Sequence, residues 1–531
     1  MSRVDDTYIN IIGAGLAGLS AAITLAKKGC HVRLFSVQPS ERAQSNLAEG
    51  GINGALDVMG ENDSVEEHFN DTMKGGCYIA SPKMVKNLTE AAPEIIMDME
   101  KLGVPFHREE GHIIQRNFGG QKKKRTAYAK SSTGKMLTVA LISEARKYEA
   151  LGYIDRYSHH RFEKLVLNKE NNTCLGVQII DTYTYAHSLY FGNTIIAAGG
   201  LNGFFRGLTT GTTANTGTLQ AVLFSQGVEM ANLEFIQYHP TTVRITEKRM
   251  LISEAARGEG GRLFCLADDG SRSYFLEEKY GDRGNLMPRD VISKEMAMLK
   301  GPAYLDLTNL SNDTWKNKLS DMREEIIHYM ALDPMEDAIP VSPGIHYFMG
   351  GILVDENHCT NIKGLYAAGE CACAYHGANR LGGNSLLGAI FGGRKSAQAI
   401  IDSKETFDVS GAEDDYAEGH IDFVCAREDE KDIEAKMQLV LQESLGIIRD
   451  ENSLSEAIDD INELISDELS EEMMVRLQFS KAMLICALER RESRGAQVRL
   501  DYPETSEEYK KTTVAGCQNK NIIIAFRELD D

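Results

Sequence analysis

The segment HGANRLGGNSLL, from His376 to Leu387, combines an arginine with a glycine-rich turn. Arg380 lies between small residues and can hold a carboxylate through two parallel N–H···O bonds. The Gly-Gly-Asn-Ser turn after it lets backbone approach a ligand closely and leads into an apolar, helix-like stretch. The free N–H groups at a helix start favour an anion or a ring carbonyl. A tight loop around a salt-bridged arginine is the alternative interpretation.

Six further residues that could bind an anion or transfer a proton precede this segment. They are His239 in QYHPTT, Ser253, Glu254 and Arg257 in SEAARGEGG, Arg289 in MPRD and His346 in GIHYFMGG. Glu254 and Arg257 are spaced i and i+3, so on a helix they would share a face and could pair or pass a proton. A satisfied hydrogen-bond network would explain each residue alone, and for a single histidine it is the better explanation. Together with Arg380 the residues suit a small dicarboxylate, because a buried anion needs donor groups at both ends.

The N-terminal region has the pattern of a β-α-β unit that binds a dinucleotide. Residues Tyr8–Ile12 are apolar and strand-like, GAGLAGLSAAITLAKKG has helical spacing, and HVRLFS predicts a second strand. Gly13, Gly15 and Gly18 occupy the G-x-G-x-x-G positions, where they make the turn, admit a pyrophosphate and let the helix pack on the strand. Ser36 ends the second strand, where an acid usually meets the ribose. Its hydroxyl can still accept and donate there, so the motif is weakened but not excluded.

The remaining segments predict an α/β fold in which this nucleotide-binding domain is interrupted. Thr194–Phe205 and Asn361–Glu370 each predict a buried strand that runs into a glycine turn. The intervening stretch has many turns and no further β-α-β pattern, which favours an inserted capping domain. The charged stretch from about Ser410 to Arg490 has helical periodicity and predicts a helical bundle. We therefore expect a Rossmann-like domain at 1–233 and 350–405, an α+β capping domain at 234–349, a helical domain at 406–500 and a short, partly strand-like segment at 501–531.

Composition limits the classes of function. The net charge of −21 disfavours nucleic acid or an anionic membrane as the main partner. No run approaches the roughly 18 apolar residues that span a bilayer, and the polar start MSRVDD does not resemble a signal peptide. The ten cysteines are scattered, which predicts free thiols and gives no support for a metal site or an iron–sulfur cluster. The basic run Lys122–Arg125 predicts a solvated loop, with a partner-docking role as the alternative.

Ten segments of the chain together resemble a known protein family. The segments GAGLAGLSAA, EGGING, RNFGGQKKKRTAYAKSSTG, EFIQYHPT, SEAARGEGG, NLMPRD, GIHYFMGGI, GLYAAGE, HGANRLGGNSLL and RRESRGAQVRLDYPE are similar to motifs of the succinate dehydrogenase/fumarate reductase flavoprotein subunits. They occur in the family's order from residue 11 to about residue 504. The FGG…KK…RTA segment resembles the branch that forms membrane complexes, and it looks less like L-aspartate oxidase, a relative with the same catalytic set.

The resemblance implies FAD as the cofactor and assigns a role to each site residue. The implied cofactor-binding residues are Gly13, Gly15, Ala17, Gly18, Ser36, Gln44, Ser45, Glu49, Gly50, Gly51, Ala198, Gly199, Glu370, Asn384, Ser385 and Leu386. The implied substrate-binding residues are His346 and Arg380 at one carboxylate, His239 and Ser253 at the other, and Phe118 beside the substrate. Arg289 would be the acid that protonates fumarate, with Glu254 and Arg257 as its proton supply. Because the pKa of a free arginine exceeds about 12, this role requires contact with the reacting carbon and a relay that restores the proton.

Two residues depart from the family's pattern. Gln44, in RAQSNLAEGG, stands where members with covalent flavin carry a histidine. Glutamine cannot form the histidyl–flavin bond, so we expect noncovalent FAD with a lower potential. Glu49 stands where the family usually has glutamine beside the flavin ring: ionised, it would lower the potential further, and protonated, it would act much like glutamine. Both departures favour reduction of an alkene over oxidation of succinate.

The resulting hypothesis is the flavoprotein subunit of a fumarate reductase, in which reduced flavin N5 gives a hydride to one alkene carbon. Its expected partners are fumarate or succinate and an iron–sulfur subunit, with room for a membrane-anchor subunit. We expect the chain in the cytoplasm, held at the cytoplasmic face of the membrane where partner subunits anchor it. The alternatives are L-aspartate oxidase, a reductase of another enoate, and a flavin-bound scaffold. The absence of the family's longer C-terminal extension puts in doubt how the iron–sulfur partner docks.

Overall fold

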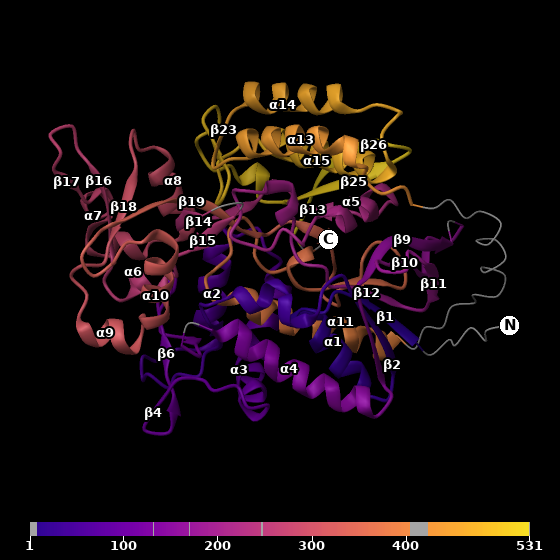
Figure 1. Ribbon diagram of the computed structural model, residues 1–531, viewed down its shortest axis with the longest axis horizontal. Coiled ribbons are helices and arrows are strands. Elements are labelled where there is room, and N and C mark those ends of the chain that lie inside the picture. The colour runs from indigo at the N-terminus through magenta and orange to yellow at the C-terminus, as the bar shows by residue number, and fades with distance from the viewer. Residues whose placement is uncertain (1–7, 131, 169, 246–247, 404–422, 530–531) are drawn as a thin grey trace.

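The computed structural model describes residues 8–130, 132–168, 170–245, 248–403 and 423–529. The polar start MSRVDD, the boundary near residue 405 and the first part of the predicted helical stretch lie outside these residues. Figure 1 shows three regions: a capping region at one end, a nucleotide-binding region in the middle and a layer of helices above it. The predicted class, a Rossmann-like domain with an inserted α+β capping domain and a C-terminal helical domain, is confirmed.

A five-stranded parallel sheet forms the centre of the nucleotide-binding region. Its strand order is β21 (Leu365–Ala367), β12 (Thr194–Ile196), β1 (Tyr8–Ile12), β2 (His31–Ser36) and β8 (Ile154–Ser158). The inner strands are buried on both faces, as expected for a parallel sheet covered by other elements. Segments from residue 8 to residue 367 therefore share one sheet, which confirms the predicted interruption of this domain.

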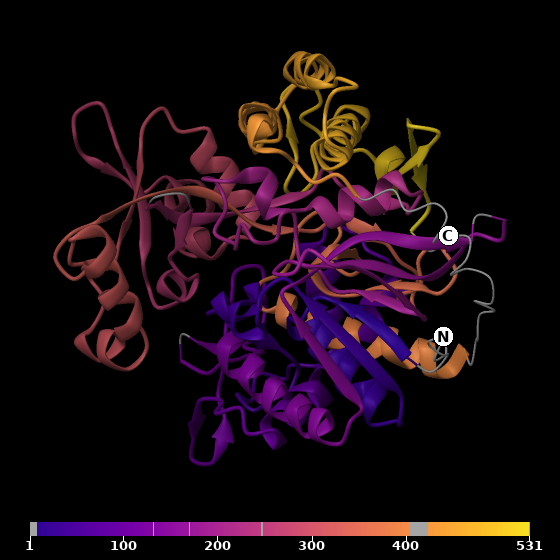
Figure 2. The same ribbon diagram turned by 45° about the vertical axis from the view of Figure 1, so that its right-hand side comes forward.

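Helices cover one face of this sheet. They are α1 (Leu16–Ala26), α4 (Thr133–Ala150) and α11 (Asn384–Ser403), which lie together below the strands in Figure 2. α1 and α11 are in backbone contact, because a Cβ atom at Gly393 would lie 2.1 Å from the carbonyl oxygen of Ala17. Both helices begin where the sequence predicts, directly after a glycine turn. The antiparallel sheet β9 (His160–Asn168), β10 (Thr173–Asp181) and β11 (His187–Phe191) adjoins the parallel sheet, and α5 (Thr218–Ser225) packs near β9.

The segment between β2 and α4 forms a small subregion of its own. Its helices are α2 (Val65–Gly75) and α3 (Pro82–Lys101). Its short strands are β3 (Ile52–Asn53), β4 (Arg108–Glu109), β5 (His112–Ile113), β6 (Gln115–Arg116) and β7 (Thr126–Ala127). The prediction of a solvated basic loop is wrong for Arg125, which is fully buried and pairs with Asp63 at 2.9 Å and Asp71 at 3.1 Å. The three lysines before it remain partly or fully exposed.

The capping region is built on a six-stranded antiparallel sheet. The strand order is β15 (Arg249–Leu251), β14 (Ile236–Arg244), β19 (Ile339–Phe348), β18 (Ala303–Asp306), β16 (Arg262–Leu266) and β17 (Arg272–Ser273). Its helices are α6 (Ala255–Gly258), α7 (Phe275–Tyr280), α8 (Arg289–Ala297), α9 (Asn312–Asn317) and α10 (Ser320–Met330). They enclose a hydrophobic core of their own, with Ile252, Leu305 and Trp315 among its members. β14 and β19 run from this core back to the nucleotide-binding region, as Figures 1 and 2 show.

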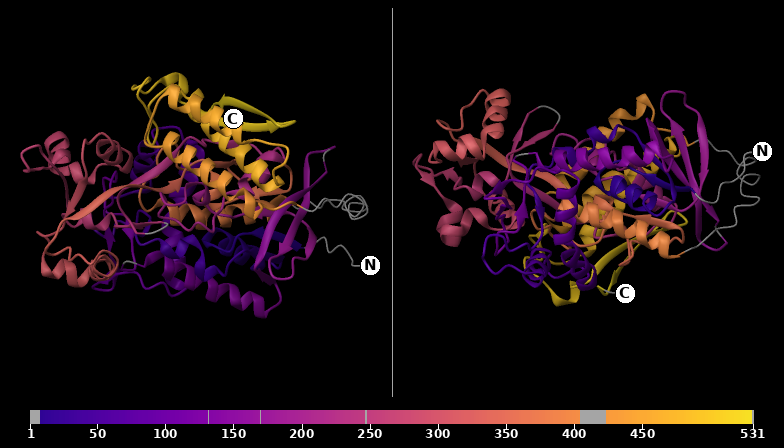
Figure 3. Two further views of the ribbon diagram at one scale, coloured as in Figure 1. Left: turned by 45° about the horizontal axis from the view of Figure 1, so that its top comes forward. Right: turned by 90° about the horizontal axis from the view of Figure 1, so that it is seen from below.

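The helical region consists of α13 (Lys431–Ser444), α14 (Glu451–Leu464) and α15 (Glu471–Glu489), which lie side by side in Figures 1 and 3. The short strands β23 (Ile448–Arg449) and β24 (Val498–Arg499) pair within it. The predicted strand NIIIAF is β26 (Asn521–Arg527), which forms a hairpin with β25 (Thr512–Gln518). This hairpin extends a sheet formed by β13 (Met230–Ala231), β20 (Gly351–Leu353) and β22 (Ala372–Cys373). On these packing relations we propose the domain boundaries given above as the division of the chain.

Candidate active site

A large pocket lies where the parallel sheet, the capping region and the helical region meet. It is lined by the glycine loop after β1, by residues 42–51, by the segments around residues 160, 198 and 215, and by residues of β14, β19 and α11. Of the sixteen residues predicted to bind the cofactor, fourteen line it; Gly18 and Asn384 do not. Gly18 lies against the turn itself, and Asn384 lies behind the pocket, where its Oδ1 accepts from Asn53 Nδ2 at 2.7 Å.

The glycine loop has the geometry that a dinucleotide requires. Gly13 has φ +117°, and a Cβ atom there would lie 2.1 Å from the carbonyl oxygen of Ala197. A Cβ atom at Gly18 would lie 1.8 Å from the carbonyl oxygen of Gly13, so only glycine lets α1 approach the strand. Gly15 differs, because its nearest protein neighbour would be Ser45 Oγ at 3.5 Å. Gly15 therefore leaves room on the pocket side, where a pyrophosphate would approach the start of α1.

Buried polar atoms without partners support a bound cofactor in this pocket. Among the described residues, Ser36 Oγ, Asn215 Nδ2 and Arg161 Nε are buried and have no hydrogen-bond partner. All three residues line the pocket. An unsatisfied buried group costs about 1–3 kcal/mol, and a ligand with many polar atoms would remove this cost. The donor set fits a dinucleotide, which offers hydroxyl, amino and phosphate groups to such atoms.

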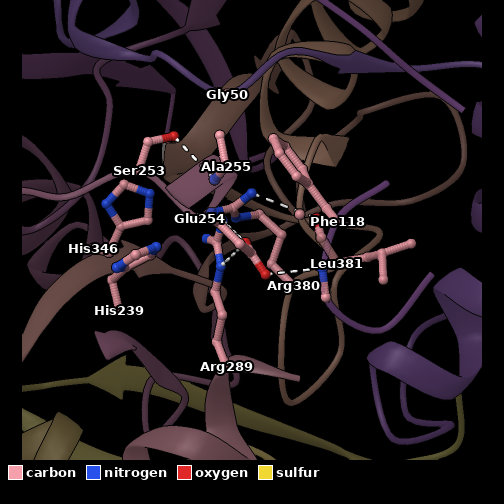
Figure 4. A network of polar contacts seen from close by, with 12 residues as sticks. Gly50, Phe118, His239, Ser253, Glu254, Ala255, Arg289, His346, Arg380 and Leu381 are labelled. Atoms are coloured by element: carbon pink, nitrogen blue, oxygen red, sulfur yellow. Dashed lines mark hydrogen bonds and ion pairs between the residues drawn. The ribbon is translucent and has the colours of Figure 1, made fainter. Parts of the chain in front are cut away.

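At the other end of the pocket, four side chains form a tight polar cluster, of which Glu254, Arg289 and Arg380 are labelled in Figure 4. Arg289 donates to Glu254 Oε2 from Nη2 at 2.8 Å and from Nε at 3.0 Å. Its Nη1 donates to Gln237 Oε1 at 3.1 Å, and Arg380 Nη2 donates to the same oxygen at 3.0 Å. Gln237 thus joins the two guanidinium groups through one acceptor. The sequence motif QYHPTT contains this glutamine, but its role depends on two arginines that are distant in sequence.

The Glu254 carboxylate is shared between the arginines and a backbone amide. Its Oε1 accepts from the Gly119 amide at 2.9 Å and lies 3.6 Å from Arg257 Nη2. Burial alone would raise the pKa of Glu254, but Arg289 and Arg257 together hold that pKa below its usual value. Arg257 is fully buried behind Glu254, does not line the pocket, and donates to the Asn285 carbonyl at 2.6 Å. Burial lowers the pKa of Arg257. Glu254 therefore bridges Arg289, which faces the pocket, and Arg257, which faces the protein interior.

Two histidines lie across the cluster from Phe118 in Figure 4. The rings of His239 and His346 are 5.3 Å apart and inclined by 64°. The Thr241 amide donates to His239 Nδ1 at 3.3 Å, so the proton of the neutral ring is on Nε2. His346 Nδ1 lies 2.8 Å from Thr210 Oγ1. Burial and the positive charge of Arg289 hold the pKa of both histidines well below the usual value, so both are neutral hydrogen-bond donors.

The remaining predicted substrate residues complete the cavity wall. Ser253 is buried, and its Oγ accepts from the Ala255 amide at 3.4 Å. The Phe118 ring packs over Gly50, where a Cβ atom would lie 3.1 Å from the ring. Arg380 stacks on Tyr347 with its Cζ 4.4 Å from the ring centroid, and burial followed by repulsion from Arg289 lowers the pKa of Arg380 to about 9. Arg380 is still charged at pH 7. The protein is acidic overall, yet this cluster holds three guanidinium groups and one carboxylate: Arg257 and Arg289 pair with Glu254, and Arg380 binds Gln237. The excess of positive charge suits an anionic substrate.

Comparison with known proteins decides the family. Residues 9–386 match the family described as FAD binding domain, and residues 468–531 match the one described as fumarate reductase flavoprotein C-term. A succinate dehydrogenase flavoprotein subunit of Bacillus subtilis (strain 168) is 37% identical, with 96% of this chain and 94% of that protein covered. The chain belongs to the succinate dehydrogenase/fumarate reductase flavoprotein family. It is an FAD-dependent oxidoreductase.

Other members of the succinate dehydrogenase/fumarate reductase flavoprotein family are similarly close. An L-aspartate oxidase of Pyrococcus furiosus is 34% identical, over 96% of this chain and 99% of that protein. The solved structure of an E. coli quinol fumarate reductase mutant has a TM-score of 0.87 and 27% identity, and covers 99% of this chain and 97% of that one. These relatives confirm the predicted family and cofactor, but the activities for which they are named differ.

Two positions that depart from the family's pattern lie together at the pocket. Gln44 is in a short 3₁₀ helix, Gln44–Leu47, and its Oε1 accepts from the Thr212 amide at 2.6 Å. Burial, with repulsion from Glu325, raises the pKa of Glu49 to about 8 against the opposing effect of Arg116. Glu49 is therefore mainly neutral at pH 7, which favours the prediction that it acts like glutamine. Burial likewise raises the pKa of Glu370 to about 7, while its Oε1 accepts from the Phe348 amide at 3.2 Å.

Three findings concern chemistry outside this pocket. None of the ten cysteines, all of which lie within the described residues, forms a disulfide. Within the described ranges, no group of three or more His, Cys, Asp or Glu side chains could hold a metal ion. Across the same described part of the chain, every helix is too short or too polar to cross a membrane.

Proposed function

We propose that this chain is the flavoprotein subunit of a fumarate reductase, which reduces fumarate to succinate with electrons from an iron–sulfur partner. The observation that carries the proposal is the cluster in which Arg289 shares Glu254 and Gln237 with the other arginines. The pocket has hydrogen-bond donors on both sides of Arg289. These donors match the two carboxylates of a dicarboxylate, whose reactive carbon would then lie beside Arg289. Bound FAD, once reduced, supplies the hydride that adds to one alkene carbon.

Arg289 is suited to donate the proton to the second alkene carbon. Of its five N–H groups, the hydrogen bonds to Glu254 and Gln237 use three, which leaves one on Nη1 and one on Nη2. Glu254 Oε2 holds one edge of this guanidinium, through Nε and Nη2, and Gln237 holds Nη1, so the group keeps a fixed orientation. After donation, Glu254 can return a proton to Arg289 and draw another from Arg257, because its two oxygens face the two arginines.

The carboxylate-binding groups orient the substrate around that acid. Arg380 and His346 are proposed to hold one carboxylate, and His239 and Ser253 the other. Neutral histidines donate hydrogen bonds without competing with the arginines for a proton. The substrate is then fixed at both ends, which aligns its double bond and excludes water from the reacting carbons. Phe118 would close the side of the cavity opposite the histidines.

The proposed direction of reaction rests on Gln44 rather than on Glu49. Glutamine at position 44 supports noncovalent FAD and the lower potential that favours fumarate reduction. Glu49, neutral at pH 7, adds no further negative charge until it ionises near pH 8. We accordingly propose a role in anaerobic electron transport in the cytoplasm, with attachment to the membrane through partner subunits.

L-aspartate oxidase is the second candidate, because relatives with that name match over nearly the whole chain. Aspartate carries an α-ammonium group that needs an anionic or acceptor partner in the pocket. Glu254 is already engaged by two arginines and an amide, Glu49 is neutral, and Phe118 offers only an apolar ring. These contacts favour fumarate over aspartate.

The test is to reduce the bound flavin without oxygen, mix it with fumarate and follow flavin reoxidation. We expect rapid reoxidation with one succinate formed per flavin. A parallel sample of oxidised protein mixed with L-aspartate should show no bleaching of the flavin. Reduction by aspartate together with slow reoxidation by fumarate would replace the proposal with L-aspartate oxidase, and no response to fumarate would point to another enoate.

A further inference from the structure

The first turn of helix α15 places a carboxylate in the cofactor pocket from the helical region. Glu472 lines the pocket, although every residue the sequence assigns to the cofactor precedes residue 387. It shares this part of the wall with Arg161 and Thr218, which belong to the nucleotide-binding region. Glu472 is buried, with 8% of its surface exposed. A buried carboxylate at a pocket wall requires hydrogen-bond donors, so its partners show what it is placed to bind.

The two carboxylate oxygens of Glu472 receive different numbers of hydrogen bonds from the protein. Oε2 accepts from the Ala426 amide at 3.1 Å and from Arg161 Nη1 at 3.5 Å. Oε1 accepts from Thr218 Oγ1 at 3.0 Å. Since each carboxylate oxygen can accept about two hydrogen bonds, Oε1 retains one free acceptor position. Because Glu472 lines the pocket, a bound ligand can fill this acceptor position.

The part of the pocket near Glu472 also holds two buried polar atoms that have no partner. Ser36 Oγ and Arg161 Nε are both buried without a hydrogen-bond partner. The capping region carries Arg289 and the two histidines. The glycine loop, where the pyrophosphate would bind, lies between that region and these two atoms. When the flavin ring lies beside the capping region, the adenosine half of FAD must lie toward Ser36, at the end of β2. Ser36 also lacks the carboxylate that commonly binds a ribose at that strand end.

We infer that Glu472 binds the adenosine half of FAD, accepting a hydrogen bond from one of its hydroxyl or amino groups through Oε1. The helical region thereby supplies an acid to a nucleotide site whose own second strand ends in serine. Arg161 and Thr218 position this carboxylate from the nucleotide-binding side. The inference concerns cofactor affinity and is independent of whether the substrate is fumarate or aspartate.

The experiment measures the affinity of apoprotein for FAD and for FMN, which lacks the adenosine half, by flavin fluorescence. In Glu472→Ala we expect the Kd for FAD to rise by about tenfold to a hundredfold, as for loss of a hydrogen bond to a charged group. The Kd for FMN should stay within about twofold. The matched control is Glu471→Ala, which removes the exposed neighbouring acid of the same helical turn and should change neither value.

A purely structural role for Glu472 would give a different pattern. Loss of the contacts to Ala426 and Thr218 would then weaken FAD and FMN alike, or lower the melting temperature with no selective loss of FAD. Either result would overturn the inference, as would an unchanged Kd for FAD in Glu472→Ala. Glu472→Gln separates the two roles further: its amide oxygen can keep one acceptor contact, so its Kd for FAD should lie between those of wild type and Glu472→Ala.

Discussion

Gln237 offers the sharpest test of how the reacting arginine is positioned. Its Oε1 accepts from Arg289 at 3.1 Å and from Arg380 at 3.0 Å, and its Nε2 donates to Asn379 Oδ1 and the Arg380 carbonyl, each at 2.7 Å. Gln237→Leu keeps a similar volume but removes all of these bonds. The two guanidinium groups, which repel each other, then lose their shared acceptor.

The expected loss of activity follows from these contacts. A hydrogen bond between a neutral and a charged group contributes about 1.5–3 kcal/mol, and Gln237 makes one with Arg289. If this energy serves to hold Arg289 against the alkene, its loss reduces kcat by roughly tenfold to a hundredfold. FAD content should not change, because Gln237 does not line the pocket.

The assay is fumarate reduction with a reduced viologen dye as electron donor, with FAD content and melting temperature measured on the same preparation. The control is Gln438→Leu, which removes another buried amide, one that donates to the Gly203 carbonyl away from Arg289. That variant should keep its kcat despite any loss of stability. A Gln237→Leu protein with full FAD content and a kcat within threefold of wild type would refute the positioning argument.

Three further perturbations test other parts of the structure. Arg289→Ala should reduce fumarate turnover by at least about a thousandfold while FAD stays bound, as measured by dye-linked rates and flavin absorbance; retained turnover would exclude Arg289 as the acid. Glu49→Gln should remove a pH dependence of stability. Because the pKa of Glu49 is raised, the folded state holds a proton that the unfolded state has lost between about pH 4.5 and 8, so wild type loses stability relative to Glu49→Gln as pH rises through this range. An identical pH profile of melting temperature in the two proteins would contradict this. Arg125→Met should destabilise the protein by about 3–5 kcal/mol, because Asp63 and Asp71 would be left buried without their partner, and a melting temperature equal to wild type would argue against this burial.

The sequence was most informative where a backbone conformation restricts the residue type. Gly13 and Gly18 are required by a positive φ and by a backbone contact, so the pattern G-x-G-x-x-G predicts the turn and the helix that follows. The helix start at Asn384 is predicted for the same reason. The sequence singles out His239, Arg289 and Arg380 because their side chains can bind an anion or transfer a proton. Their convergence on one pocket could not be derived from spacing alone.

Other features had no local signal. β13 has only two residues, and its partners β20 and β25 come from distant parts of the chain, so periodicity could not reveal that sheet. The basic run hid the burial of Arg125, because the acids that neutralise it, Asp63 and Asp71, are distant in sequence. Glu472 could not be predicted for a similar reason. It is one of many acids in a charged helical stretch, and it differs from its neighbours only because it lines the pocket.

The pairing of β13 has a consequence for biosynthesis. Met230 pairs with Ala515, more than half of the chain later, so one edge of β13 has no partner until the ribosome has made β25. The nearby Glu234 is fully buried and takes its hydrogen bonds from Arg490 and Thr513, which are synthesised equally late. A nascent chain that already contains the capping region therefore exposes an open strand edge, which favours aggregation or chaperone binding, while Glu234 must stay solvated until its partners are made. The segment from β13 to Glu234, which precedes Gln237 and His239, is therefore among the last parts to fold. A working site is delayed until the chain is nearly complete.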